Sequence, residues 1–428
     1  MYPTSSSPLP TYRDRVVDHE IPAVLKAARA VLIEGPKACG KTWTGQRFAR
    51  SEVFLEERPD LWGIATQATG LLLDGATPRL LDEWQRVPDL WHLVRAACDR
   101  RGLPGQFILT GSAVPTDELT RHSGAGRISR VRMRPMSLYE MGLSPGEVSV
   151  GEMLEGFETW ECPVVEASLD VPELVAAACR GGWPQFIDFP LEDAMRQVRS
   201  YVDNICRVDV SAVDGVRRSP ERVMRLMQSL AHNVANHVGF DKLAQETEGQ
   251  TPLNRGTVKT YMETLSRLFV VEDLPAWNVH LRSRGRLLKA PKRHFVDPSL
   301  APAALGVGPR RYLEDLNAFG FLLESMAVRD LRVYAQAHDA SVYYYRDYGG
   351  LEVDAVMEAR DGRWIAAEVK LGGSEAIDQG AAALLKLRDR VTERRAARLA
   401  RLLVITGGRY SYVRPDGVTV VPLAVLGP

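Results

Sequence analysis

The chain has 428 residues, of which 45% are hydrophobic and 25% are charged, a composition typical of globular proteins. Its 54 basic and 54 acidic residues cancel. This balance excludes an overall basic field, so any contact with nucleic acid must use a local patch. The length exceeds what one hydrophobic core usually organises, and we therefore expect two or three domains.

Cysteine content and apolar runs indicate the compartment. The five cysteines are scattered and include no C-x-x-C pair, which argues against a zinc ribbon and a disulfide framework. The stretch MYPTSSSPLPTYRDR lacks the apolar core of a secretory signal. No apolar run approaches the roughly 18 residues that span a bilayer. We therefore expect a cytoplasmic protein with no membrane partner.

Apolar runs and helical patterns divide the chain. A polar, proline-bearing lead-in covers residues 1–20. Short apolar runs then alternate with helical patterns to about residue 135, as is typical of buried parallel strands in an α/β domain. These runs are AVLIE (30–34), RLLDE (79–83) and QFILTGS (106–112). Residues 201–275 have a mostly helical period, and a helix precedes a hairpin after residue 310.

The stretch VLIEGPKACGKTW (31–43) matches G-x-x-x-x-G-K-[ST]. Glycines let backbone N–H groups surround a β-phosphate, and the following helix points its positive N-terminus at it. Lys41 is expected to reach the β- and γ-phosphates of ATP, and Thr42 to bind Mg²⁺. The strand-like run before the motif argues against a chance glycine loop. The predicted nucleotide-binding residues are Gly35, Pro36, Lys37, Ala38, Cys39, Gly40, Lys41, Thr42 and Trp43.

Two acids follow the second apolar run. Asp82 is expected to hold Mg²⁺ through water, and Glu83 to polarise the attacking water. The alternative is that both acids favour the N-terminus of the next helix, but beside the phosphate loop we favour hydrolysis. The run QFILTGSA places Thr110 and Ser112 as candidate γ-phosphate sensors, with a plain strand end as the alternative.

An arginine-rich stretch, TRHSGAGRISRVRMRP (120–135), comes next. One of its arginines is expected to act as an arginine finger or sensor, unless the run is a solvated face. Arg127, which follows Gly-Ala-Gly, is the first choice. The other candidates are Arg121, Arg130, Arg132 and Arg134.

Residues 240–277 predict a helix, a polar turn, a second helix that begins after the N-cap Asn254, and an apolar strand. The second helix has an apolar face with 3–4 spacing, made of Val258, Tyr261, Met262, Leu265 and Leu268. The opposite face offers Arg255, Lys259, Thr260 and Thr264. This is the pattern of a winged helix that enters a major groove of DNA. The basic segment 281–294 could contact phosphates; a packing module is the alternative.

The stretch LEVDAVMEARDGRWIAAEVKLGG (351–373) predicts a hairpin that turns at Asp361-Gly362. Nucleases of the PD-(D/E)xK type hold Mg²⁺ between an Asp on one strand and a Glu on the next, with a Lys two residues later on the same face. Asp354, Glu368 and Lys370 fit this pattern, and Glu324 in the preceding helix adds an acid. Mn²⁺ is an alternative metal here. The signature is short, so an ordinary hairpin and an inactive nuclease fold stay open.

Together these motifs resemble a family of bacterial and archaeal AAA+ ATPases with a P-loop domain, a winged helix and a C-terminal PD-(D/E)xK-like domain. The resemblance covers nearly the whole chain and rests on GPKACGKT, LLDEWQ, FILTGSA, GAGR, RGGWPQF, KRHFVDPSLA, GFLLES and EVDAV…AAEVK. It implies ATP hydrolysis at Lys41, Asp82 and Glu83. It also implies a nuclease-like site at Glu324, Asp354, Glu368 and Lys370.

The predicted fold class is α/β, with three domains after the lead-in. These are a P-loop, AAA+-like parallel-sheet domain with its lid (21–200), a winged-helix middle domain (201–295) and an α/β restriction-endonuclease-like domain (296–428). The expected function is a Mg²⁺-dependent ATPase that acts on DNA or is recruited to it. The alternative is an ATP-switched regulatory or scaffold protein whose nuclease-like domain is inactive. A nucleotide kinase is a weaker alternative. The sequence leaves open whether the chain forms a homo-oligomer or binds a protein partner.

Overall fold

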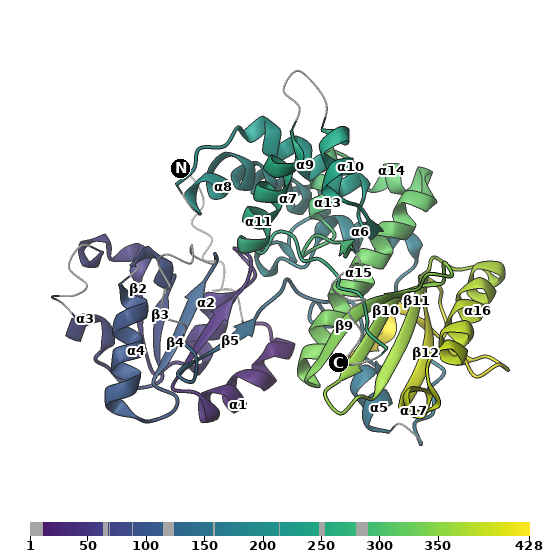
Figure 1. Ribbon diagram of the computed structural model, residues 1–428, viewed down its shortest axis with the longest axis horizontal. Coiled ribbons are helices and arrows are strands. Elements are labelled where there is room, and N and C mark those ends of the chain that lie inside the picture. The colour runs from purple at the N-terminus through teal and green to yellow at the C-terminus, as the bar shows by residue number, and fades with distance from the viewer. Residues whose placement is uncertain are drawn as a thin grey trace, which may run out of the picture.

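The computed structural model describes residues 12–62, 67, 69–87, 89–113, 124–156, 159–213, 215–247, 253–279 and 290–428. Arg121 and most of the basic segment 281–294 lie outside these residues. The described chain forms an N-terminal module (residues 12–145), a helical module (170–314) and a C-terminal module (315–428). The two sheets lie on opposite sides of the view in Figure 1, with the helical module above and between them. The segment 146–169 runs between modules and is called the crossing segment.

The N-terminal module is built on a five-stranded sheet with the order β2-β3-β4-β1-β5, and its paired strands are parallel. Both faces are buried, because Val31 and Ile33 pack toward α1 and α2 whereas Ala30 and Leu32 pack toward α4. Burial on both faces explains the continuous apolar runs. The strands are β1 (Ala30–Glu34), β2 (Ser51–Phe54), β3 (Arg79–Asp82), β4 (Phe107–Gly111) and β5 (Ile128–Arg132). The helices are α1 (Glu20–Ala27), α2 (Lys41–Phe48), α3 (Thr69–Leu73) and α4 (Leu90–Arg101).

The crossing segment packs on the C-terminal module, although the sequence analysis placed it in the ATPase range 21–200. Its strand β6 (Val148–Ser149) pairs in parallel with β15 (Leu426–Gly427). Its helix α5 (Val150–Glu155) contacts α15 and β12 and lies beneath the C-terminal sheet in Figure 1. The apolar residues of β6 and α5 indicate a buried face but do not show which sheet buries it.

The helical module contains short helices and a small antiparallel sheet. The helices are α6 (Val171–Arg180), α7 (Leu191–Asn204), α8 (Val210–Ala212), α9 (Pro220–His232), α10 (Phe240–Glu246), α11 (Arg255–Arg267), α13 (Leu300–Leu305) and α14 (Pro309–Glu314). The strands β7 (Asn236–His237) and β8 (Lys292–Arg293) pair, and Lys292 also bridges Leu274. Asn254 caps α11 as expected, since its side chain accepts a hydrogen bond from the Thr257 N–H at 2.8 Å. Thr264, expected on the polar face of α11, is buried. Its hydroxyl donates to the Thr260 carbonyl within the helix, and this bond satisfies the hydroxyl away from water.

The C-terminal module contains a mixed six-stranded sheet with the order β13-β14-β12-β11-β10-β9. Helix α15 covers one face and α16 the other. The strands are β9 (Ala340–Arg346), β10 (Glu352–Ala359), β11 (Trp364–Lys370), β12 (Leu399–Thr406), β13 (Tyr412–Val413) and β14 (Thr419–Pro422). The helices are α15 (Leu316–Ala337), α16 (Ser374–Arg390) and α17 (Glu393–Ala396). The expected hairpin is β10–β11, and β9 is an additional strand before it.

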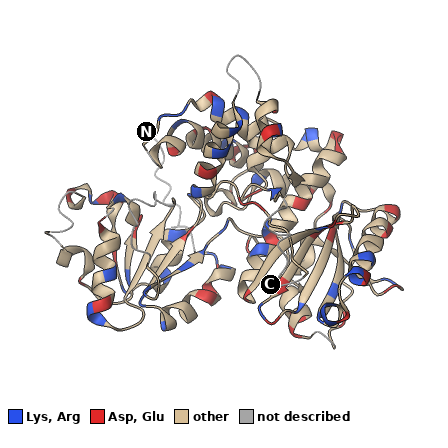
Figure 2. Cartoon of the chain, viewed as in Figure 1, with Lys and Arg blue, Asp and Glu red and all other residues tan. Residues whose placement is uncertain are grey.

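The distribution of charged residues over the fold agrees with the equal numbers of basic and acidic residues in the sequence (Figure 2). Basic and acidic residues are interspersed over every module drawn in Figure 2. Within the described part of the chain, no helix combines the length and the apolar character that crossing a bilayer would require.

Candidate functional site

The phosphate loop lies at the carboxyl edge of the parallel sheet. It follows β1, while Asp82 ends β3 and Thr110 lies near the end of β4, the strand between them. Ligands of open α/β sheets bind outside the carboxyl ends of the strands. The structure therefore brings these predicted residues to one edge.

The backbone of the loop has the conformation that a phosphate cradle needs. Ala38 and Gly40 have φ values of 61° and 102°, and these left-handed positions let the chain curl before α2 begins. A Cβ at Gly35 would lie 2.0 Å from the Met133 carbonyl oxygen, so only glycine fits there. Lys41 Nζ spans the loop and donates to the Pro36 carbonyl at 2.7 Å. Trp43, at the start of α2, is 46% exposed.

The hydroxyl of Thr42 and the carboxylate of Asp82 form a pair of oxygen donors. Thr42 Oγ1 donates to Asp82 Oδ1 at 2.9 Å, and Thr110 Oγ1 donates to the same oxygen at 2.6 Å. Burial raises the pKa of Asp82, and the two hydroxyl bonds oppose that shift. Mg²⁺ prefers carboxylate and other hard oxygen ligands. The pair therefore fits a Mg²⁺ ion held beside the phosphates.

Glu83 is held in a strained backbone conformation next to the loop. Its φ is 52°, a left-handed value that is uncommon outside glycine and is often found at functional sites. Its carboxylate accepts hydrogen bonds from Ser112 Oγ at 2.8 Å and from the amide of Gln85. Ser112, expected as a phosphate sensor, thus positions Glu83, and Thr110 bonds Asp82 and the Glu83 N–H.

Arg127 lies at the opposite edge of the sheet from the phosphate loop. It precedes β5, whose first residue, Ile128, is in register with Ala30 at the start of β1. Its guanidinium is paired with Asp99 at 2.8 Å. Arg127 is therefore not brought to the phosphate loop of its own chain, and a finger role would require the loop of a neighbouring subunit.

Two residues that the sequence analysis missed contact the loop. Arg15, from the expected polar lead-in, is buried and donates to the Cys39 carbonyl at 2.8 Å. Asp209, on a π-helical turn (Ile205–Asp209) after α7, lies 2.5 Å from Lys37 Nζ. π-Helical turns are often found at functional sites. No local motif marks these contacts, because the partners are 24 and 172 residues apart in sequence.

The three predicted residues of the C-terminal hairpin converge on one point. Lys370 Nζ lies 2.5 Å from Glu368 Oε2 and 3.8 Å from Asp354 Oδ2. The register of β10 against β9 shifts between Val353 and Val356, and such a bulge re-aims a side chain. Asp354 lies within it, and its Oδ2 accepts the Val369 N–H at 3.0 Å.

A lysine that the sequence analysis assigned to phosphate contacts lies inside this cluster. Lys292 Nζ is 2.8 Å from Glu324 Oε1, 2.8 Å from Glu352 Oε1 and 3.0 Å from Asp354 Oδ1. Its side chain is 2% exposed. Burial alone would lower the pKa of Lys292, but the three carboxylates raise it well above its ordinary value. Lys292 and Glu352 are therefore members of the site that the sequence analysis missed.

The acids of this cluster, here called the C-terminal acid cluster (Glu324, Glu352, Asp354 and Glu368), have divergent pKa values. Burial raises the pKa of Glu324 and of Glu368 to about 8, with Asp354 adding to each shift. Burial would also raise the pKa of Glu352, but hydrogen bonds from His237 and Lys292 lower it to about 2. Among the described residues, no group of three or more His, Cys, Asp or Glu side chains has the arrangement of a metal site.

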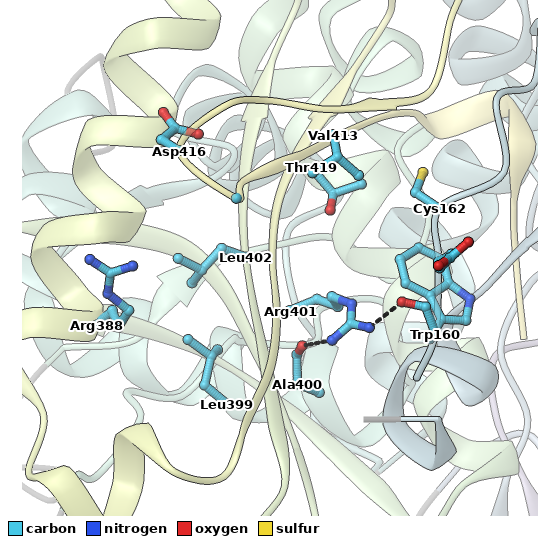
Figure 3. A pocket seen from close by; sticks show the side chains of 12 residues that line it. Trp160, Cys162, Arg388, Leu399, Ala400, Arg401, Leu402, Val413, Asp416 and Thr419 are labelled. Carbon is cyan, nitrogen blue, oxygen red and sulfur yellow. Dashed lines mark hydrogen bonds between the residues drawn. The ribbon is translucent and has the colours of Figure 1, made fainter. Parts of the chain in front are cut away.

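A cavity of about 570 Å³ lies between the crossing segment and the strands β12 and β14 (Figure 3). Arg401, at its edge, donates to the backbone carbonyls of Trp160 and Ala400. None of the predicted site residues lines this cavity. The guanidinium of Arg401 holds the crossing segment against the sheet.

Comparison with protein families divides the chain much as the structure does. Residues 27–142 match a family model described as "AAA domain". Residues 171–311 and 319–426 match two models described as domains of unknown function, DUF8612 and DUF4143. Together with the loop geometry, the first match identifies the N-terminal module as an AAA-type, P-loop ATPase-like domain.

Similar whole chains are also known. Uncharacterized proteins of Mycobacterium tuberculosis (strain H37Rv; Rv2008c) and Mycobacterium bovis (Mb2031c) are each 26% identical over 406 residues, 93% of this chain and 81% of theirs. The Walker-type ATPase PABY2304 of Pyrococcus abyssi aligns with 69% of this chain and 96% of its own, at 15% identity and a TM-score of 0.41. A DNA replication initiation factor aligns with 59% of this chain and 86% of its own, at 13% identity and a TM-score of 0.23.

The pKa shifts predict that the C-terminal acid cluster loses stability as the pH rises. Burial, with Asp354 nearby, raises the pKa of folded Glu324 to about 8 from the ordinary value of 4.5 that applies in the unfolded chain. Because the folded state binds more protons between these values, the free energy of unfolding should fall across that window. Glu324→Gln should reduce this slope and leave the part that Glu368 contributes, as measured by urea unfolding at about pH 5.5 and about pH 8.5. The exposed control Glu375→Gln should keep it, and an unchanged slope in Glu324→Gln would contradict the assignment.

Proposed function

We propose that this protein is a Mg²⁺-dependent ATPase that hydrolyses ATP at the carboxyl edge of the N-terminal sheet. The observation that carries the proposal is the convergence of Lys41, Thr42, Asp82 and Glu83 on one edge. Lys41 binds the β- and γ-phosphates, and Thr42 and Asp82 hold Mg²⁺, which neutralises phosphate charge. Glu83 orients the attacking water and accepts its proton, while Ser112 fixes the carboxylate.

In this proposal, the contact between Lys37 and Asp209 transmits the nucleotide state to the helical module. Asp209 is paired with a lysine of the phosphate loop at 2.5 Å. Incoming phosphates compete for Lys37 and repel the Asp209 carboxylate, since like charges at short range disfavour each other. ATP therefore favours a state in which this turn has left the loop. This observation supports the second candidate function, an ATP-switched regulatory or scaffold protein.

We further propose that the helical module contacts DNA as a winged helix. The order α9, β7, α10 and α11, followed by paired segments that bridge Leu274 to Lys292 and Val271 to Phe295, supports that fold. On α11, the side chains of Arg255 and Lys259 are 71% and 62% exposed. Their pairs with Asp241 and Glu263 are surface ion pairs, which are weak and can yield to phosphates.

Lys41→Ala should lower ATP turnover by about a hundredfold or more, because it removes the cation that faces the reacting phosphates. Glu83→Gln should lower turnover similarly while ATP binding persists, because only the proton acceptor is lost. Phosphate release and the binding of a fluorescent ATP analogue measure the two effects. Lys26→Ala, at an exposed position of α1, is the matched control. Unchanged turnover in Lys41→Ala would remove the proposed ATPase site.

Asp209→Asn should tighten ATP binding by about fivefold, because the carboxylate that competes for Lys37 is gone. Asp203→Asn, an exposed change of the same kind near the end of α7, should leave the affinity unchanged. Titration with a fluorescent ATP analogue checks both variants. Equal or weaker ATP binding by Asp209→Asn would contradict the proposed coupling between Lys37 and Asp209, but it would not affect the proposed site of ATP hydrolysis.

Reversing the α11 charges should weaken duplex DNA binding. Arg255→Glu with Lys259→Glu should reduce the salt slope of log Kd by about 2, since each phosphate contact contributes about one counterion. The control is Arg310→Glu with Arg311→Glu, an equal charge change at exposed positions of α14. Fluorescence anisotropy at several salt concentrations measures the slopes. Equal losses in the two double variants would mean that α11 is not the DNA-contacting surface.

A further inference from the structure

We infer that the ammonium group of Lys292 is the resident cation of the C-terminal acid cluster and excludes a divalent metal ion from it. The motif at Asp354, Glu368 and Lys370 predicted a Mg²⁺ or Mn²⁺ site, whereas the side chains present do not fit one. The inference concerns the C-terminal module alone and is independent of ATP hydrolysis by the N-terminal module.

Each N–H donor of the Lys292 ammonium group has one acidic oxygen within hydrogen-bond distance of Nζ. A lysine offers three N–H donors, and three carboxylate oxygens lie around Nζ at 2.8, 2.8 and 3.0 Å. Glu324 comes from α15, Glu352 and Asp354 come from β10, and Lys292 itself comes from β8 of the helical module. The contacts of this ammonium group thus join three elements, while Glu368, the remaining acid of the cluster, pairs with Lys370 on β11.

A divalent ion would need the space and the oxygens that Lys292 already uses. Mg²⁺ requires oxygen ligands at about 2.0–2.1 Å in near-octahedral geometry. An ion bridging Glu324 and Asp354 would have to occupy the position of Nζ, which contacts both. An ion between Asp354 and Glu368, the pair that the motif predicts, would need an oxygen of Asp354 that is already bonded. The other oxygen of Asp354 accepts the Val369 N–H at 3.0 Å and lies 3.8 Å from Lys370 Nζ. Both oxygens of the expected ligand are therefore engaged.

The backbone of Lys292 is paired with a neighbouring segment on each side. Its N–H donates to the Leu274 carbonyl at 3.0 Å, and the Leu274 N–H donates back at 2.9 Å. On the other side, Lys292 is in register with His237 of β7. The side chain is 2% exposed, so the ammonium group is enclosed by its three acidic partners and the surrounding protein. Removal of the ammonium would also leave the Asp354 carboxylate with only the more distant Lys370 Nζ, at 3.8 Å, and an underpaired buried charge is unfavourable.

With Lys292 in the cluster, the C-terminal module is not suited to metal-dependent nuclease chemistry. Metal-dependent phosphodiester cleavage needs an ion that stabilises developing charge on the phosphate, and this cluster has its positive charge fixed on the protein. The same ion pairs attach β8 of the helical module to β10 and α15 of the C-terminal module. The acids serve as a joint between modules.

Titration of the nucleotide-free, full-length protein with Mn²⁺, followed by electron paramagnetic resonance, tests the inference. The wild type should show no saturable site in the micromolar range. Lys292→Met, which keeps the apolar stem and removes the charge, should bind one Mn²⁺ at least about tenfold more tightly. Lys370→Met makes the same charge change but leaves Lys292 in place, so it should gain no site. A gain in both variants, or in neither while both stay folded, would overturn the inference.

A second measurement keeps the inference testable if Lys292→Met fails to fold. Wild type and Asp354→Asn should bind Mn²⁺ equally weakly, and neither should cut single- or double-stranded DNA in its presence. A stoichiometric Mn²⁺ site or a cleavage activity that Asp354→Asn removes would overturn the inference. ATP turnover in the same samples reports separately on the N-terminal site, so a failure of that proposal is distinguishable.

Discussion

Buried charge on one short strand fixes how the helical and C-terminal modules meet. Lys292 points into the C-terminal acid cluster, whereas Arg293 turns to Asp273 in the helical module, because neighbouring strand side chains face opposite ways. Further along, Asp297 accepts the Gly182 N–H at 2.9 Å and pairs with Arg329 of α15 at 3.1 Å. Each charge has its partner in another element, and separation would leave a buried charge unpaired.

The nucleotide site was the most predictable part of the molecule, because its chemistry is local. The residues from Gly35 to Thr42 are contiguous, so their spacing alone sets the loop, and parallel strands carry Asp82 to the same edge. Arg15 and Asp209 could not be found in this way. Each reaches the loop from a distant part of the chain, and isolated charged residues in sequence are usually solvated.

The C-terminal site was predictable in its hairpin and in Glu324, the acid of the preceding helix. The period of two along the strands placed Asp354, Glu368 and Lys370 together, as the structure has them. The partner that decides their chemistry was missed, because Lys292 belongs to the basic segment 281–294, for which the sequence predicts phosphate contacts. The apolar residues that follow Lys292 were the available signal for burial. Arg127 was favoured for its glycine-rich neighbours, which say nothing about the edge of the sheet to which a turn belongs.

The crossing segment ties two parts of the chain that are distant in sequence. Val148 pairs with Leu426, and the Ser149 hydroxyl donates to the Pro428 carbonyl at 2.6 Å. During synthesis, residues 146–169 leave the ribosome long before β15 exists, so their backbone groups wait for partners made much later. If residues 296–428 alone were exchanged for an unrelated domain, β6 of the crossing segment would lose β15, the strand with which it pairs. The crossing segment therefore depends for its backbone partners on the end of the C-terminal module, which matches a different family model from the ATPase-like module that precedes it.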